Sequence, residues 1–204
     1  MVALVEAAKA DDFPAEIAVV ISNRADAAGL ARAAKEGVPT VTIDSKSFGK
    51  DRAAFEAKLQ SALEDHRIEL ICLGGFMRLF TAEFVQAWYG KMLNIHPSLL
   101  PSFPGLDPHG QALSAGVKVS GATVHFVTPE TDAGPIVMQG VVEVRDDDTP
   151  DTLSERILTI EHQIYPNALR LLARGKLRLD GAVCRLTDEA DAAGSLISPR
   201  PAKE

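Results

Sequence analysis

The sequence has few cysteines, no excess of basic charge and no long apolar run. Its two cysteines lack CxxC or His-rich spacing, which argues against a disulfide framework and a zinc site. With 21 Lys and Arg against 28 Asp and Glu, the net charge of −7 disfavours binding to the phosphate backbone of nucleic acid. No apolar stretch approaches the roughly 18 residues of a membrane span, and the start lacks the basic region of a signal peptide. We therefore expect a cytoplasmic protein with Cys72 and Cys184 as buried thiols.

What remains is an ordinary globular composition, with 46% hydrophobic and 24% charged residues. A length of 204 residues favours one domain, which we place at residues 1–186 because no linker divides that stretch. Residues 187–204 are polar, Pro-rich and aperiodic, and this pattern predicts a disordered tail.

The first half of the chain alternates apolar strand-like runs with amphipathic helices. Such alternation is typical of an α/β fold in which helices cover both faces of a mostly parallel, doubly wound sheet. Ligands bind at the carboxyl ends of the strands in such sheets. The predicted strands are 16–22, 38–44, 68–75 and 91–95, and the predicted helices between them are 23–37, 51–66 and 81–90.

The second half has a different pattern. Residues 119–144 predict two strands joined by an acidic turn. A long helix follows, with Thr149 as its N-cap and Pro150 in its first position. Pro166 falls inside this helix and predicts a kink or a local break.

Three polar residues are candidates for chemistry. Asn94 and His96 flank Ile95, and alternate residues of a strand point to the same face, so an amide donor and an imidazole meet at one strand end. A carboxylate such as Asp132, in the TDAGP turn, would orient the ring and stabilise its charged form. Spacing alone does not exclude the alternative that Asn94 and Asp132 are turn residues and His96 is a core histidine. No metal-ligand spacing or P-loop is present, and the Gly74–Gly75 pair is a weak phosphate signal.

Longer segments carry a resemblance to a known family. The chain contains NIHPSLLPSFPGLDPHGQAL, GATVHFVTPETDAGPIVMQ and EHQIYP, and it also contains ISNRADAAGLARAAKEGVPT and LGGFMR. In this order and spacing, from about residue 3 to about residue 180, they resemble the glycinamide ribonucleotide formyltransferases of de novo purine synthesis. Several motifs at consistent spacing are far more specific than one short pattern.

The resemblance implies a formyltransferase fold whose sheet ends in an antiparallel C-terminal portion. It implies transfer of the formyl group of 10-formyltetrahydrofolate, without a metal, to the amine of phosphoribosylglycinamide. Asn94 and protonated His96 would donate to the oxyanion formed when the amine attacks the formyl carbon. Asp132 would keep His96 charged and help pass the amine's proton to the leaving nitrogen through water.

The resemblance also implies where the substrates bind. Apolar walls and backbone groups suit a flat pteridine, and a guanidinium suits a glutamate tail. Without the resemblance, the apolar candidates would be core residues and Arg52 a solvated helix start. Glu161 resembles the residue that contacts the ribose hydroxyls of the nucleotide. The implied folate-binding residues are Arg52, Met77, Arg78, Leu79, Phe80, Asn94, Thr128, Pro129, Glu130, Thr131 and Asp132.

The sequence departs from the family in two places. The family begins with a further strand and a Gly-rich loop whose amides hold the substrate phosphate. No such segment is present, and MVALVEAAKA resembles the helix after that loop, so we expect the chain to begin inside its first helix. We also expect an exposed apolar groove along the sheet. The smaller departure is Asp107, where many relatives carry His, whereas His109 fits the pattern.

Three alternative functions compete with this assignment. Formyltetrahydrofolate hydrolase uses a similar trio, but it has a second His where Pro97 stands and an additional N-terminal domain. Methionyl-tRNA formyltransferase has Arg-Gly in place of Pro104 and Gly105 and needs a basic tRNA surface. A truncated paralogue would bind folate without catalysis. The sequence predicts small-molecule partners, and it is compatible with either a monomer or a homodimer.

Overall fold

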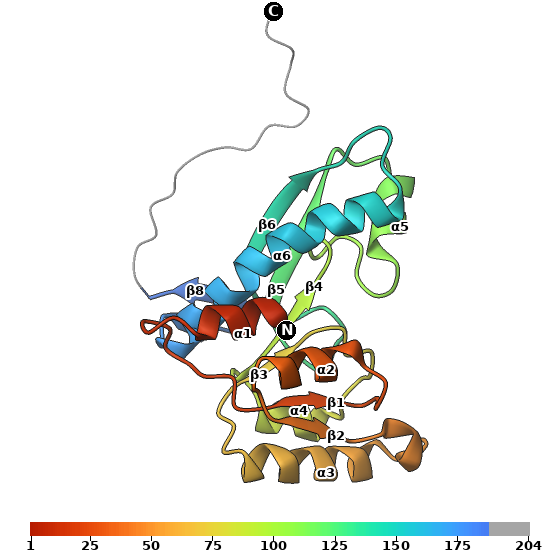
Figure 1. Cartoon of the computed structure of the whole chain (residues 1–204). Coiled ribbons are helices and arrows are strands. Elements are labelled where there is room, and N and C mark those ends of the chain that lie inside the picture. Colours follow the sequence, from red (N-terminus) through yellow and green to blue (C-terminus); the bar gives the residue numbers. More distant parts are fainter. Residues whose placement is uncertain (188–204) are drawn as a thin grey trace, which may run out of the picture.

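Helices and short parallel strands alternate through the first half of the protein, as predicted (Figure 1). The computed structural model describes residues 1–187, so residues 188–204 of the predicted tail lie outside the described residues. The strands are shorter than predicted: the segment 16–22 contributes only Val20–Ser22, and 68–75 only Ile71–Leu73. The elements in order are α1 (Val2–Ala8), β1 (Val20–Ser22), α2 (Ala28–Lys35), β2 (Thr40–Thr42), the 3-10 helix η1 (Ser45–Phe48), α3 (Arg52–Asp65), β3 (Ile71–Leu73), α4 (Ala82–Ala87) and β4 (Met92–His96).

Side-chain caps mark the starts of two helices of the first half. Asp51 begins α3, and its side chain accepts a hydrogen bond from the N–H of Ala54 at 2.9 Å. Thr81 caps α4 in the same way, by accepting from Phe84. The apolar stripe of α3 is buried, which accounts for the position of this helix against the sheet. Its members are Phe55, Leu59, Ala62 and Leu63.

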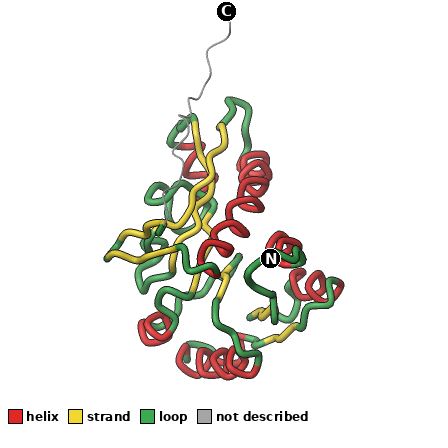
Figure 2. The backbone as a smooth tube through the Cα atoms, turned by 90° about the vertical axis from the view of Figure 1, so that its left-hand side faces the viewer, coloured by secondary structure: helices red, strands yellow, loops and turns green. Residues whose placement is uncertain are grey.

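The second half forms an antiparallel extension of the sheet. Its elements are α5 (Pro108–Ser114), β5 (Val119–Phe126), β6 (Ile136–Glu143), α6 (Pro150–Ala173), β7 (Leu177–Asp180) and β8 (Val183–Leu186). In the order β3-β4-β5-β6, β3 and β4 are parallel and the other neighbours are antiparallel. The long helix α6 runs beside these strands (Figure 2). Together the two halves give the predicted α/β sheet with its antiparallel C-terminal portion.

The helix α6 is continuous through Pro166, so the predicted break is wrong. Pro166 is itself buried, and the stripe around it includes Leu153, Ile157 and Ala168, each at most 1% exposed. Burying a large aliphatic side chain contributes about 1.5–3 kcal/mol. Several such side chains together offset the roughly 3 kcal/mol that an interior proline costs a helix.

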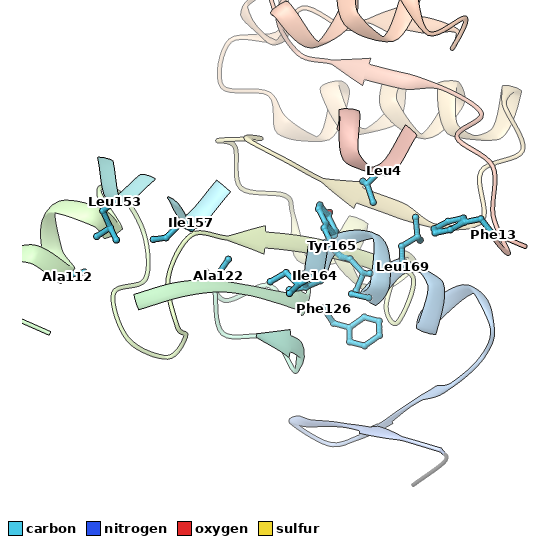
Figure 3. Close-up of a cluster of buried hydrophobic side chains, with 13 residues drawn as sticks. Leu4, Phe13, Ala112, Ala122, Phe126, Leu153, Ile157, Ile164, Tyr165 and Leu169 are labelled. Carbon is cyan, nitrogen blue, oxygen red and sulfur yellow. The ribbon is translucent and has the colours of Figure 1, made fainter. Parts of the chain in front are cut away.

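Two apolar clusters form the core. The larger one lies between α6 and the sheet, and it extends to Leu4 of α1 and to Phe13, which lie near Tyr165 and Leu169 (Figure 3). The second cluster joins α3 and α4 to the strands and includes Phe55 and Trp88. The Tyr165 hydroxyl donates to the carbonyls of β3 and β4, at 2.6 Å from Leu73 O and 3.2 Å from Leu93 O.

The sheet is interrupted between β1 and β3. The pair β1–β2 is separate from β3–β4, and Figure 2 shows the two short strands apart from the long ones. A groove of about 930 Å³ lies between them, lined by Ala18–Ser22 on one side and Leu70–Leu73 on the other. Protein interiors contain few voids larger than a water molecule, which occupies about 30 Å³ in the liquid. This groove is far larger than such a void. The predicted apolar groove is therefore present.

Candidate active site

The end of β4 brings two candidate residues to the same face. Asn94 and His96 are two positions apart on this strand, beside β3 on one side and β5 on the other. Leu73, the last residue of β3, pairs with Asn94, so the loop that follows β3 begins next to the site. The site therefore lies at the carboxyl ends of the parallel strands, as predicted.

The His96 ring is buried between a carbonyl and a carboxylate. Its Nε2 lies 3.0 Å from Phe103 O, and because a carbonyl only accepts, this nitrogen carries a proton and donates it. Its Nδ1 lies 3.4 Å from Asp132 Oδ2. A ring protonated on both nitrogens would satisfy both partners. The His96 and Asp132 side chains are 8% and 11% exposed, which limits screening of their interaction by water.

A second histidine, His125 on β5, completes the cluster. Its Nδ1 lies 2.9 Å from Phe126 O and its Nε2 lies 3.2 Å from Asn94 Nδ2. The carbonyl requires a proton on Nδ1, so Nε2 accepts from the Asn94 amide and fixes the orientation of that amide. Asp132 Oδ1 lies 3.8 Å from Nε2. Burial lowers the pKa of His125, with the Phe126 carbonyl and Asp132 acting in the opposite direction.

The turn between β5 and β6 carries Asp132 to the trio. Asp132 has φ of +53°, a left-handed conformation that Asp tolerates better than most residues. Its Oδ2 accepts a hydrogen bond from Gly105 N–H at 2.8 Å, which joins this turn to the loop after β4. Gly134 lets the turn approach the strand, because a Cβ there would lie 1.8 Å from Phe126 O.

The loop of residues 74–80 contains four predicted folate-binding residues on two different faces. Met77 and Leu79 point to solvent, 75% and 58% exposed. Arg78 lies with its guanidinium carbon 5.3 Å from the centre of the Phe55 ring, and Phe80 belongs to the second apolar cluster. Val127, at the start of the Asp132 turn, packs against this same cluster. The loop and the turn therefore pack against the same apolar cluster.

The remaining predicted binding residues surround this region less closely. Arg52 is exposed at the start of α3, and within residues 1–187 no hydrogen bond joins it to the trio. Thr128 donates to Glu130 O at 3.2 Å, and Pro129, Glu130 and Thr131 are exposed. Glu161 lies on α6 one turn before Tyr165. Burial raises its pKa, and the nearby Met1 ammonium opposes this shift.

Residues 1–187 contain no group of three or more His, Cys, Asp or Glu side chains placed to hold a metal ion. No helix in the described part of the chain has the length and apolar character needed to cross a membrane.

The fold described above is that of a known class of enzymes. The candidate site of this fold is formed by Asn94, His96 and Asp132 at the end of β4. The Formyl transferase family matches residues 1–169, and the chain belongs to this family. Among curated relatives, the phosphoribosylglycinamide formyltransferase of Bacillus subtilis (strain 168) is 41% identical over 83% of this chain and 87% of its own. The predicted family resemblance is thereby confirmed.

Other relatives and structures agree. A region of the trifunctional purine biosynthetic protein adenosine-3 of Bos taurus is 48% identical over 92% of this chain, which spans only 19% of that protein's length. The crystal structure of glycinamide ribonucleotide transformylase 1 from Symbiobacterium toebii superposes with a TM-score of 0.88 at 46% identity. It covers 91% of this chain and 87% of its own.

Proposed function

We propose that this protein transfers the formyl group of 10-formyltetrahydrofolate to the amine of 5'-phosphoribosylglycinamide. The observation that carries the proposal is the contact of His96 with Asp132 beside Asn94 at the end of β4. Family membership and the names of relatives above 40% identity support the same reaction. Residues 1–186 are proposed to act as one domain, with these two small molecules as partners, in the cytoplasm.

The chain's residues would divide the chemistry as follows. The amine nitrogen attacks the formyl carbon, the carbonyl oxygen becomes an oxyanion, and the carbon–N10 bond of the folate then breaks. Asn94 has a second amide hydrogen besides the one given to His125, and this hydrogen can stabilise the oxyanion. His96 Nε2–H is the second donor. The oxyanion competes with Phe103 O to accept the hydrogen bond from this group. The Asp132 carboxylate stabilises the charged ring while the amine's proton moves to the leaving nitrogen.

The substrate surfaces follow from exposure. Met77 and Leu79 present apolar side chains to solvent between β3 and α4, as a wall for a flat heterocycle requires. Backbone groups of Arg78 and Phe80 and of Thr128, Pro129, Glu130 and Thr131 are proposed to bind its edges. Arg52 is proposed to bind the glutamate tail, and Glu161 the ribose hydroxyls.

The hydrolase alternative uses water in place of the amine. Two of the similar proteins above are named as a formyltransferase and a transformylase, and Pro97 directly follows His96. The non-catalytic alternative is disfavoured because all three members of the trio are present and in contact through His96, Asp132 and His125.

One assay separates the three functions. Purified protein is incubated with 10-formyltetrahydrofolate, with and without phosphoribosylglycinamide, while N-formyl product and free formate are both measured. A transferase gives N-formyl product only when the amine is present. Formate release at an equal rate without the amine would identify a hydrolase, and folate binding without either product would identify a binding protein.

A further inference from the structure

A buried carboxylate holds the end of the 74–80 loop. Glu56 lies on α3 and is only 6% exposed. It accepts two hydrogen bonds from Thr81, one from the backbone N–H at 2.7 Å and one from the hydroxyl at 2.5 Å. The Thr81 oxygen in turn accepts from Phe84 N–H at 3.3 Å as the N-cap of α4. Glu56 thus fixes the residue at which the loop ends and α4 begins.

The surroundings of Glu56 would otherwise favour an apolar residue. Its neighbours on α3 include the buried Phe55 and Leu59, and burying a carboxylate is costly unless hydrogen bonds compensate for the lost water. Both of its oxygens are used on a single residue, Thr81. This arrangement specifies the position of the loop end more strongly than apolar packing, which has no preferred direction.

The loop that Glu56 holds has two distinct faces. The inner face is aromatic: Phe76 stacks on Phe80 with ring centres 4.9 Å apart, and Phe80 stacks on Phe84 at 4.7 Å. The outer face presents Met77 and Leu79 to solvent. A shift of the loop by one residue would exchange these faces, since neighbouring side chains of an extended segment point in opposite directions.

We propose that Glu56 is a positioning residue for the folate, keeping Met77 and Leu79 outward by holding Thr81. This inference rests on the proposed function and deepens it. Without the carboxylate, the half-buried Thr81 N–H loses its partner, and the loop is in the binding-competent arrangement for only part of the time. The apparent affinity for folate falls by that fraction, whereas the trio, held by β4 and β5, keeps its geometry.

Three variants test this role. Glu56→Ala removes both acceptors. Glu56→Gln keeps an oxygen for the Thr81 N–H and offers an amide hydrogen to the Thr81 oxygen. Glu64→Ala is the matched control, because Glu64 lies on the same helix but is exposed, with Gln60 as its hydrogen-bond partner at 2.8 Å. We expect Glu56→Ala to raise the KM for 10-formyltetrahydrofolate by about tenfold with kcat nearly unchanged. The other two variants should stay close to the parent.

Amide hydrogen exchange of Thr81 and Phe84, measured without folate, gives a second readout. Glu56→Ala should accelerate both, and Glu56→Gln should restore protection. A Glu56→Ala protein with a lower melting temperature but parental KM and exchange would show a role in stability alone and overturn the proposal. Equal KM increases in the Gln and Ala variants would overturn it as well. A parent protein that neither binds folate nor transfers formyl would refute the proposed function, and the exchange data would still decide whether Glu56 holds the loop.

Discussion

Replacing Asp132 by Asn removes a charge from the candidate active site with little change in shape. Asn tolerates the φ of +53° at this position, and its amide oxygen can still accept the Gly105 N–H bond. What is lost is the charge attraction between the carboxylate and the His96 ring, whose Nδ1 lies 3.4 Å from Asp132 Oδ2. A full charge pair at this separation is worth about 5 kcal/mol at an effective dielectric constant near 20. This value is an upper limit, because the charge on the ring is needed fully only in the transition state.

General acid–base groups accelerate a reaction by about 10²–10⁴-fold. We therefore expect kcat of Asp132→Asn to be lower than that of the parent by a factor in this range. Folate affinity should change little, since the substitution acts on the transition state. The assay is formyl transfer at saturating concentrations of both substrates, with folate binding measured separately by calorimetry. Asp107→Asn is the control, because Asp107 also has a left-handed backbone, at φ of +52°, and caps α5. A kcat within tenfold of the parent, or a loss explained wholly by folate affinity, would refute the assigned role.

Three further predictions concern binding and stability. Arg52→Ala should raise the KM for folate by less than about fivefold at unchanged kcat, since exposed ion pairs contribute about 0–1 kcal/mol; a collapse of kcat at saturating folate would contradict this placement. Folding lowers the pKa of His125, so as the pH falls the unfolded chain binds a proton at this residue before the folded protein does. The contribution of His125 to the free energy of unfolding is therefore fully present above about pH 6.5 and declines as the pH falls toward the folded-state pKa. In urea titrations, His125→Gln should therefore lose less unfolding free energy than the parent between pH 7.5 and 5.5, and equal losses would be inconsistent with burial of a neutral ring. Fusing a copy of residues 16–22 and a Gly-rich turn ahead of Met1 should raise the melting temperature by several degrees, because the added strand can pair with β1 and β3. The same fusion with two central prolines should leave the melting temperature unchanged. Equal melting temperatures of the two fusions would contradict strand pairing.

Periodicity was sufficient to predict the alternation of strands and helices in the first half of the chain and the common face of Asn94 and His96. Both depend on local rules, namely alternation along a strand and the position of ligand sites in parallel sheets. The connection to Asp132 came from family resemblance, because it depends on a turn held by Gly105, far away in the sequence. His125 was missed for a related reason: it pairs with Asn94 across β4 and β5, and an antiparallel register is not evident from the residues of one strand.

The lengths of β1 and β3 and the continuity of α6 also depended on tertiary context. The interruption between β1 and β3 could be deduced only through comparison with a family pattern. At Pro166 a local rule was outweighed by burial of the surrounding helix.

The divided sheet gives the two parts of the protein unequal resistance to local unfolding. The strands β1 and β2 have three residues each, and among residues 1–187 they pair only with one another. Isolated two-stranded pairs are marginally stable. Asn94 and His96 lie instead on β4 of the four-stranded sheet beside α6, and Asp132 lies in the turn that joins β5 to β6 of the same sheet. Mild heating should therefore open residues 17–50 first, giving a species that keeps the trio assembled while it exposes the apolar faces of α3 and β3. Such a species is prone to self-association, so aggregation on storage should begin before the trio loses its geometry.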